Sequence, residues 1–254
     1  MRNLAKYAFP AAAIVAVGLP PVAAAGVISA GGNVFVSGGT CFLTSTSGFY
    51  EERCTDGLGT DARALASVGP GGALPTLGAL AEISSPPSSV GAVAEAIAQF
   101  EDTMSFAAGV ATVSFDFDID GAIATSGTAG DGPSAYFEFQ APGAFTFQEF
   151  PLGATSTTLT TIDIPISGGT LAISLLLKAL AAAPGGGVQS TDFSSTLTIS
   201  DVIQRDVTGN RVFTPILSEL GFSYNPSTAP MPEPGSGWLV VMGLIALRRS
   251  RRRS

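Results

Sequence analysis

Three aspartates, Asp116, Asp118 and Asp120, alternate with apolar residues and are followed by Gly121. This Asp-x-Asp-x-Asp-Gly order matches the opening of a calcium-binding loop, in which carboxylate oxygens hold the ion. The match ends there, because counting from Asp116 places Gly127 where such a loop needs a bidentate glutamate. The preferred interpretation is three carboxylates on the solvent face of an amphipathic strand. A calcium ion that relieves their mutual repulsion is the alternative.

The chain has two cysteines, Cys41 and Cys54, flanked by threonine, serine and glycine. A redox or nucleophilic thiol would need a C-x-x-C spacing or a neighbouring base, and the sequence gives no sign of either. The pair therefore predicts one disulfide that closes a short loop.

Histidine is absent from all 254 residues, which removes Ser-His-Asp and Cys-His nucleophilic sites and histidine-ligated zinc or haem. No nucleophile elbow, phosphate-binding loop or dinucleotide fingerprint stands in a fitting context. A carboxylate pair for glycoside hydrolysis stays open, since the separation of two carboxylates is invisible in a sequence. The expected body has no tryptophan and only Tyr50, Tyr136 and Tyr224, and its phenylalanines alternate like core residues. The chain is therefore expected to be no enzyme and to need no cofactor, apart from the calcium alternative.

The elements that must position these residues read as strands. The 31 glycines and 17 prolines, among many serines and threonines, favour short strands joined by turns. Apolar and polar residues alternate with a period of two from Val113 to Ile119, which predicts a strand with one buried face. The alternation recurs at Phe137 and Phe139, at Phe145 and Phe147, from Ile162 to Ile166 and from Leu171 to Leu177, and further strands are expected at 194–202, 211–213 and 220–224. This spacing predicts an all-β fold whose body is an antiparallel β-sandwich or resembles a jelly roll. Residues 26–87, rich in glycine, serine and proline, are expected to be irregular.

The N-terminal end carries the features of a processed segment. Two basic residues precede a twelve-residue apolar stretch, two prolines end it, and three alanines follow. This order predicts a secretory signal helix in residues 1–25, cleaved between Ala25 and Gly26. A retained membrane anchor is the alternative, but a helix of this length reaches only ~18 Å against a hydrocarbon core of ~30 Å.

The other end has three parts in order: Pro232, Glu233 and Pro234, then an uncharged apolar stretch, then a basic terminus. The apolar stretch is expected to form a short membrane helix and consists of Trp238, Leu239, Val240, Val241, Met242, Gly243, Leu244, Ile245, Ala246 and Leu247. The basic stop consists of Arg248, Arg249, Arg251, Arg252 and Arg253. By the positive-inside rule these arginines keep the extreme C-terminus in the cytoplasm while the body is translocated.

This three-part order resembles the PEP-CTERM sorting region, with its Pro-Glu-Pro at Pro232, Glu233 and Pro234. The resemblance implies a Gram-negative bacterium, recognition by a membrane-embedded exosortase, a transient inner-membrane intermediate, and release to the cell surface or extracellular matrix. A surface-lying amphipathic helix is the alternative, but the apolar stretch has no polar face.

The body is also similar to a broad group of PEP-CTERM passenger domains between residues 93 and 224. The likeness rests on a Phe-x-Asp strand at Phe100 and Asp102 and on a late Asp-Phe-Ser segment at 192–194. Those passenger domains have no assigned activity, so the likeness implies no function. It does favour a strand for residues 93–104, whose apolar residues fit helical spacing and one strand face alike.

The chain thus divides into a signal peptide (1–25), a Gly/Ser/Pro-rich part with one disulfide (26–90), a β-sandwich body (91–225), a linker (226–231) and the sorting region (232–254). Between Gly26 and Met231, five basic residues stand against nineteen acidic ones, a net charge of −14. That charge disfavours nucleic acid and anionic lipid as partners. The expected function is an exported structural or adhesive protein of an exopolysaccharide or biofilm matrix, with exosortase as processing partner and exopolysaccharide as a further partner. The alternatives are a secreted carbohydrate-active or carbohydrate-binding protein and a calcium-dependent adhesion module.

Overall fold

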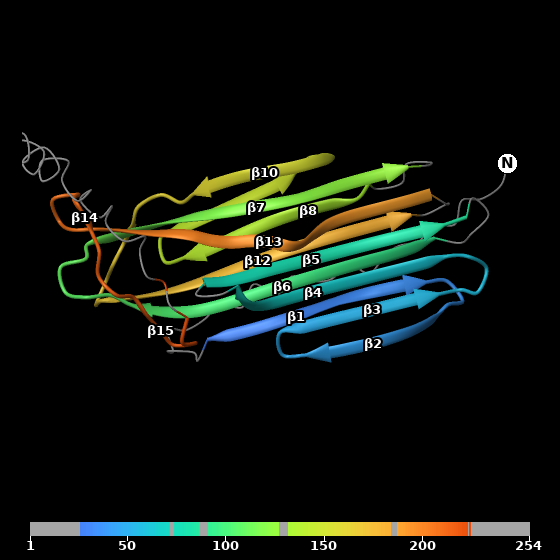
Figure 1. The fold of residues 1–254 in the computed structure, drawn as a ribbon, viewed down its shortest axis with the longest axis horizontal. Helices are drawn as coiled ribbons and strands as arrows, with labels where there is room; N and C mark the ends of the chain where they lie inside the picture. Colours follow the sequence, from blue (N-terminus) through green and yellow to red (C-terminus); the bar gives the residue numbers. More distant parts are fainter. Residues whose placement is uncertain are drawn as a thin grey trace, which may run out of the picture.

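The computed structural model of the protein describes residues 26–71, 74–86, 91–126, 132–183, 187–222 and 224. Within these residues the chain forms fifteen strands and no helix, and every strand pair is antiparallel. The strands run along the long axis of the molecule and build two sheets, which we name sheet A and sheet B (Figure 1). The predicted all-β, antiparallel class is therefore confirmed.

Sheet A follows the order β1 (Val27–Val36), β6 (Ala92–Ser105), β12 (Thr170–Ala183), β8 (Ser134–Ala141) and β9 (Ala144–Phe150), with β15 (Leu217–Ser218) added to β6. Sheet B follows the order β10 (Gly153–Thr160), β7 (Thr112–Ser126), β13 (Gly187–Arg205), β5 (Leu74–Ser85), β4 (Asp61–Gly71), β3 (Phe49–Thr55) and β2 (Thr40–Thr46). Two short strands complete it, β11 (Ile164–Pro165) on β7 and β14 (Arg211–Val212) on β13.

Phenylalanines from both sheets meet in the core. The ring centroid of Phe117 on β7 lies 5.0 Å from that of Phe137 and 5.4 Å from that of Phe139, both on β8. Phe115 lies 5.4 Å from Phe139, and all four rings are fully buried. Because β7 belongs to sheet B and β8 to sheet A, these rings pack the two sheets against each other, as in a β-sandwich.

Alanine replaces phenylalanine farther along the core. β6 and β12 bury a matched row in sheet A, in which Ala92, Ala94 and Ala96 lie opposite Ala183, Ala181 and Ala179. In sheet B, β4 and β5 bury alanines of their own at 62, 64, 66, 79 and 81. Small side chains therefore fill this part of the close-packed interior.

The period-two patterns that predicted strands are confirmed at β7, β8, β9 and β12. Residues 93–104 lie in β6, with every second side chain buried, so the strand interpretation of this segment is confirmed. The late strands expected at 194–202 and 211–213 correspond to β13 and β14.

The expectation of irregular structure in residues 26–87 is wrong, because β1 to β5 occupy most of that stretch. The glycines and serines that suggested irregularity largely form the turns between strands or lie within them. The alternation in β4 is one of small side chains, with Ala62, Ala64 and Ala66 fully buried. These three residues carry little of the apolar bulk that marks a strand in a sequence.

Two smaller expectations are also corrected. Between Ile162 and Ile166 only the two-residue β11 forms, and Ile162 is exposed. Leu220 and Phe222 are not in a strand, and the nearby β15 ends at Ser218 instead. No helix that could span a membrane occurs in the described part of the chain, and both apolar terminal segments lie outside it.

Candidate functional site

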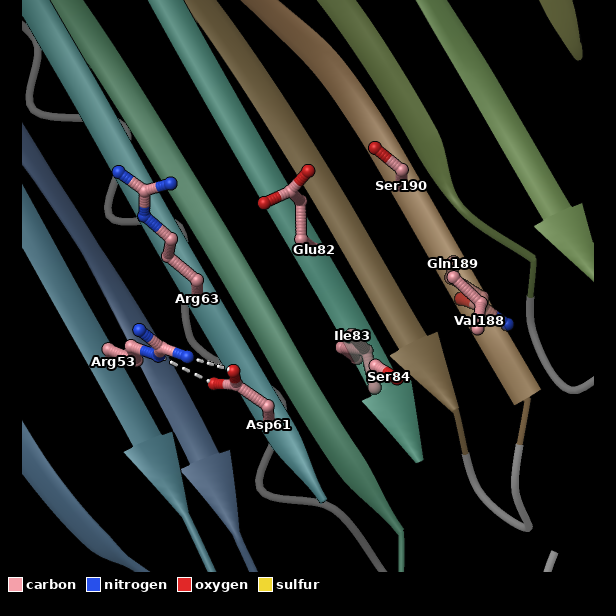
Figure 2. A pocket seen from close by; sticks show the side chains of 9 residues that line it. All are labelled: Arg53, Asp61, Arg63, Glu82, Ile83, Ser84, Val188, Gln189 and Ser190. Atoms are coloured by element: carbon pink, nitrogen blue, oxygen red, sulfur yellow. Dashed lines mark hydrogen bonds and ion pairs between the residues drawn. The ribbon is translucent and has the colours of Figure 1, made fainter. Parts of the chain in front are cut away.

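An open groove of about 310 Å³ lies across four neighbouring strands of sheet B. Figure 2 shows its lining side chains standing on β3, β4, β5 and β13. The charged and hydroxyl-bearing members are Arg53, Asp61, Arg63, Glu82, Ser84 and Ser190. No aromatic side chain lines it. The groove therefore suits a polar ligand better than an apolar one.

Two ion pairs hold the arginines of the groove in place. Arg53 binds Asp61 through both carboxylate oxygens, with Nε 2.9 Å from Oδ1, and these hydrogen bonds raise the pKa of Arg53. Arg63 binds Oε1 of Glu51 through Nε at 2.9 Å and through its terminal nitrogen at 2.8 Å. Both pairs are solvent-exposed, so each adds little to stability. The ion pairs instead hold Arg53 and Arg63, two of the five basic residues between Gly26 and Met231, side by side on neighbouring strands.

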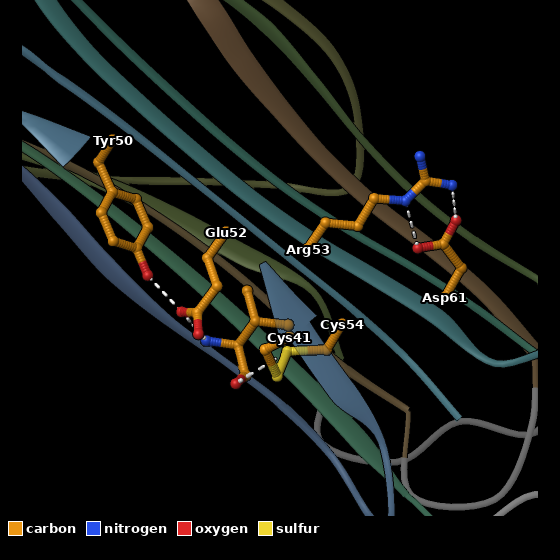
Figure 3. The surroundings of a disulfide bond; sticks show 7 residues. Cys41, Tyr50, Glu52, Arg53, Cys54 and Asp61 are labelled. Atoms are coloured by element: carbon orange, nitrogen blue, oxygen red, sulfur yellow. Dashed lines mark hydrogen bonds and ion pairs between the residues drawn. A yellow bond between two sulfur atoms is a disulfide. The ribbon is translucent and has the colours of Figure 1, made fainter. Parts of the chain in front are cut away.

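The predicted disulfide between Cys41 and Cys54 is confirmed. It joins directly opposite residues of β2 and β3, with a Cα–Cα distance of 4.0 Å, and Cys54 is buried (Figure 3). Glu52 lies beside it and accepts hydrogen bonds from the Val34 backbone N–H at 2.9 Å and from the hydroxyl of Tyr50. Burial, and then the hydrogen bond to Glu52, raise the pKa of Tyr50. This network ties the β2–β3 hairpin to β1 of the other sheet.

The cysteines and Glu52 are also the one group of three or more candidate metal ligands within 4.8 Å of one another in the described residues. Both sulfurs are consumed in the disulfide and are not thiolates. This cluster is accordingly structural.

The three aspartates of the calcium-like motif form a single row on β7. Asp116 accepts a hydrogen bond of 2.7 Å from Thr160 Oγ1, and Asp118 one of 2.7 Å from Thr158 Oγ1, both on β10. They do not converge on one point, because no set of carboxylates within 4.8 Å arises here among the described residues. The arrangement supports the interpretation as the solvent face of a strand.

The glycine of that motif has a different reason to be there. Gly121 lies inside β7 without the positive φ that would need glycine. A Cβ at this position would approach the ring of Phe193 to 2.3 Å. Phe193 is fully buried, and its ring packs against that of Phe150 in a tilted arrangement, with the ring centroids 4.8 Å apart. The glycine thus makes room for an aromatic core residue, where a calcium loop would use it for a sharp turn.

Sequence reasoning missed an aromatic row on the outer face of sheet A. Phe145 and Phe147 of β9 are 62% and 51% exposed, so the expectation that the phenylalanines are core residues is wrong for these two, as it is for Phe35, Phe42 and Phe213. The ring centroid of Phe147 lies 5.4 Å from that of Tyr136 on β8. On the neighbouring strand β12, Nζ of Lys178 lies over the Tyr136 ring, 5.9 Å from its centroid. A period-two pattern shows that a strand has two different faces without showing which one is buried.

The remaining predicted site residues lie outside the described part of the chain. These are Ala25 at the signal cleavage point, the motif at 232–234, the apolar stretch at 238–247 and the arginines at 248–253. Gly26, on the other side of the predicted cut, is the first described residue and directly precedes β1.

No protein-family model matches the chain, and no curated protein matches its sequence.

Proposed function

We propose that this protein is exported through an exosortase-type sorting route and serves as a structural or adhesive component of the cell surface or exopolysaccharide matrix. The observation that carries the proposal is the order of Pro232, Glu233 and Pro234, an apolar stretch and an arginine terminus, opposite a secretory signal at the other end. The disulfide of the body fits an oxidising compartment outside the cytoplasm.

The described body favours a structural role over a catalytic one. Its groove lacks the aromatic side chains on which a sugar ring would stack. All five of its basic side chains are in ion pairs, as Arg53 is with Asp61 and Arg63 with Glu51. The strong net negative charge of the body favours solubility at high local concentration, which suits a scaffold.

Localisation of two matched variants tests the proposal in a Gram-negative host that has an exosortase and secretes exopolysaccharide. Glu233→Ala removes the charged centre of the motif, and we expect a full-length chain retained in the inner membrane. Glu219→Ala removes an exposed glutamate of the body and is the control. We expect it to reach the matrix fraction like the unaltered chain. Release of the Glu233→Ala chain at the unaltered level would refute the sorting route.

A second candidate function, carbohydrate binding, is favoured by the aromatic row of Tyr136, Phe147 and Phe145. Exposed rings along a sheet face offer apolar surface to the C–H groups of a sugar. Co-sedimentation with insoluble polysaccharide tests it. We expect Phe147→Ala to weaken retention, while Phe35→Ala, which removes a ring 57% exposed on another strand, leaves retention unchanged. Equal retention of both variants would exclude this surface.

A further inference from the structure

The edge strand β2 is the most exposed of the strands in the described part of the chain. All seven of its residues are exposed, including Phe42 at 72% and Leu43 at 62%. It ends the order of sheet B, and no described strand pairs with its second edge. An edge of this kind presents unpaired N–H and C=O groups that can template another strand.

The disulfide reveals which backbone groups of β2 are free. Directly opposite residues of an antiparallel pair are about 5.5 Å apart when they exchange hydrogen bonds and about 4.5 Å apart when they do not. Cys41 and Cys54 are directly opposite and 4.0 Å apart, so they form a pair without backbone hydrogen bonds. The pattern alternates along β2, and the N–H and C=O groups that point away from β3 therefore belong to Cys41, Leu43 and Ser45.

The two edges of sheet B, β2 and β10, differ in the charged residues that lie beside them. β2 carries no charged residue, proline or glycine. Of the three charged residues on the neighbouring strand β3, Arg53 and Glu51 are in ion pairs, and the carboxylate of Glu52, which lies opposite Leu43, accepts two hydrogen bonds. β10 at the far edge lies beside the row of Asp116, Asp118 and Asp120 on β7. Two copies of a chain with a net charge of −14 repel each other less at β2, which has one carboxylate without an ion pair beside it, than at β10, which has three.

We propose that β2 pairs antiparallel with β2 of a second copy of this chain, in a register centred on Leu43. A two-fold axis then passes beside Leu43, which exchanges both backbone hydrogen bonds with its counterpart, and Cys41 pairs with Ser45 of the other copy. The two B sheets become one continuous sheet. A seven-residue strand pair is small for an interface, so association is weak and depends on concentration. The pairing rests on the body and is independent of the sorting route.

Sedimentation velocity of the full chain in mild detergent, from micromolar to submillimolar concentration, measures the association. Leu43→Lys places two like charges across the two-fold axis, and we expect the chain to stay monomeric at every concentration. Leu152→Lys is the matched control, since Leu152 is also 62% exposed but lies outside the strands. It should associate like the unaltered chain. Both variants keep the apolar C-terminal stretch, so association through that stretch would persist in both.

A charge exchange tests the register itself. Leu43→Lys and Leu43→Glu chains should each be monomeric alone, and an equimolar mixture should recover dimers because opposite charges then meet at the axis. Recovery requires residue 43 of one copy to lie close to residue 43 of the other, as the proposed register places it. An unaltered chain that stays monomeric throughout, or a mixture that does not recover, would overturn the proposal.

Discussion

The hydroxyl of Tyr224 donates a hydrogen bond of 3.0 Å to Oδ2 of Asp102, 122 residues earlier in the chain. Asp102 points into the core from β6 and is 2% exposed. Its carboxylate also accepts hydrogen bonds from Ser218 Oγ and from the Leu220 backbone N–H. A buried carboxylate is stable only when it is satisfied in this way, so these donors fasten Ser218, Leu220 and Tyr224 to the sandwich.

Removing the tyrosine hydroxyl should loosen that attachment. Tyr224→Phe leaves Asp102 buried with one donor fewer, and we expect the free energy of unfolding to fall by about 1–3 kcal/mol. Urea denaturation measures it. Tyr136→Phe is the control, because the Tyr136 hydroxyl makes no hydrogen bond within the described residues. A Tyr224→Phe chain as stable as the control would mean that the contact contributes nothing.

The same tyrosine should make the fold sensitive to alkali. Burial, then the charge of Asp102, raise the pKa of Tyr224, and burial likewise raises that of Tyr50. The folded state thus binds the phenolic protons more tightly than the unfolded state. The stability this supplies is complete below the unfolded pKa of about 10 and is lost as the pH rises above it. Urea midpoints from about pH 8 to about pH 11 should fall, and fall less steeply in Tyr224→Phe. A urea midpoint that does not change over this pH range would contradict the raised pKa values of Tyr224 and Tyr50.

Reduction of the disulfide should weaken the body without abolishing the fold. The bond closes a loop with a sequence separation of 13, which corresponds to about 3 kcal/mol of chain entropy. We expect a reductant to lower the urea midpoint of the unaltered chain and to leave a Cys41→Ala/Cys54→Ala chain unmoved. Alkylation without reductant should label neither cysteine in exported protein. Two labelled cysteines would show that the bond does not form there.

Calcium should have no specific effect through the aspartate row. Each of Asp116 and Asp118 already accepts a threonine hydrogen bond, and the row offers no convergent ligand set. In calorimetry, replacing calcium by a chelator should leave the melting temperature unchanged, both in the unaltered chain and in Asp118→Asn. A calcium-dependent rise that Asp118→Asn abolishes would restore the calcium alternative, because an ion that binds only the folded state raises its stability.

Periodicity was sufficient to predict much of the fold, because strands such as β7 alternate large apolar residues with polar ones and β12 has a large apolar residue at every second position from Leu171 to Leu177. It failed on β4, where the buried residues are alanines that carry little hydrophobic signal. It also could not predict the groove, which depends on a register that places Arg53 opposite Arg63 and Arg63 opposite Glu82. Such cross-strand neighbours arise only once four strands pair, and one of them, β13, is more than a hundred residues from the others.

Gly121→Ala tests whether the motif glycine serves packing. The added methyl group would meet the ring of Phe193 at 2.3 Å, and a buried ring wedged against Phe150 has little room to move. We expect a loss of about 1–3 kcal/mol in the free energy of unfolding, as for other overpacked cores. Gly31→Ala is the matched control, since Gly31 also lies within a strand, lacks a positive φ, and has nothing within 4 Å of an added Cβ. That variant should be neutral or slightly stabilising.

Combining Gly121→Ala with Phe193→Leu should lower the free energy of unfolding by less than the sum of the two single changes, because the smaller side chain vacates the space that the methyl group needs. Strict additivity would show that the two residues do not compete for one space, and the glycine would then need another explanation.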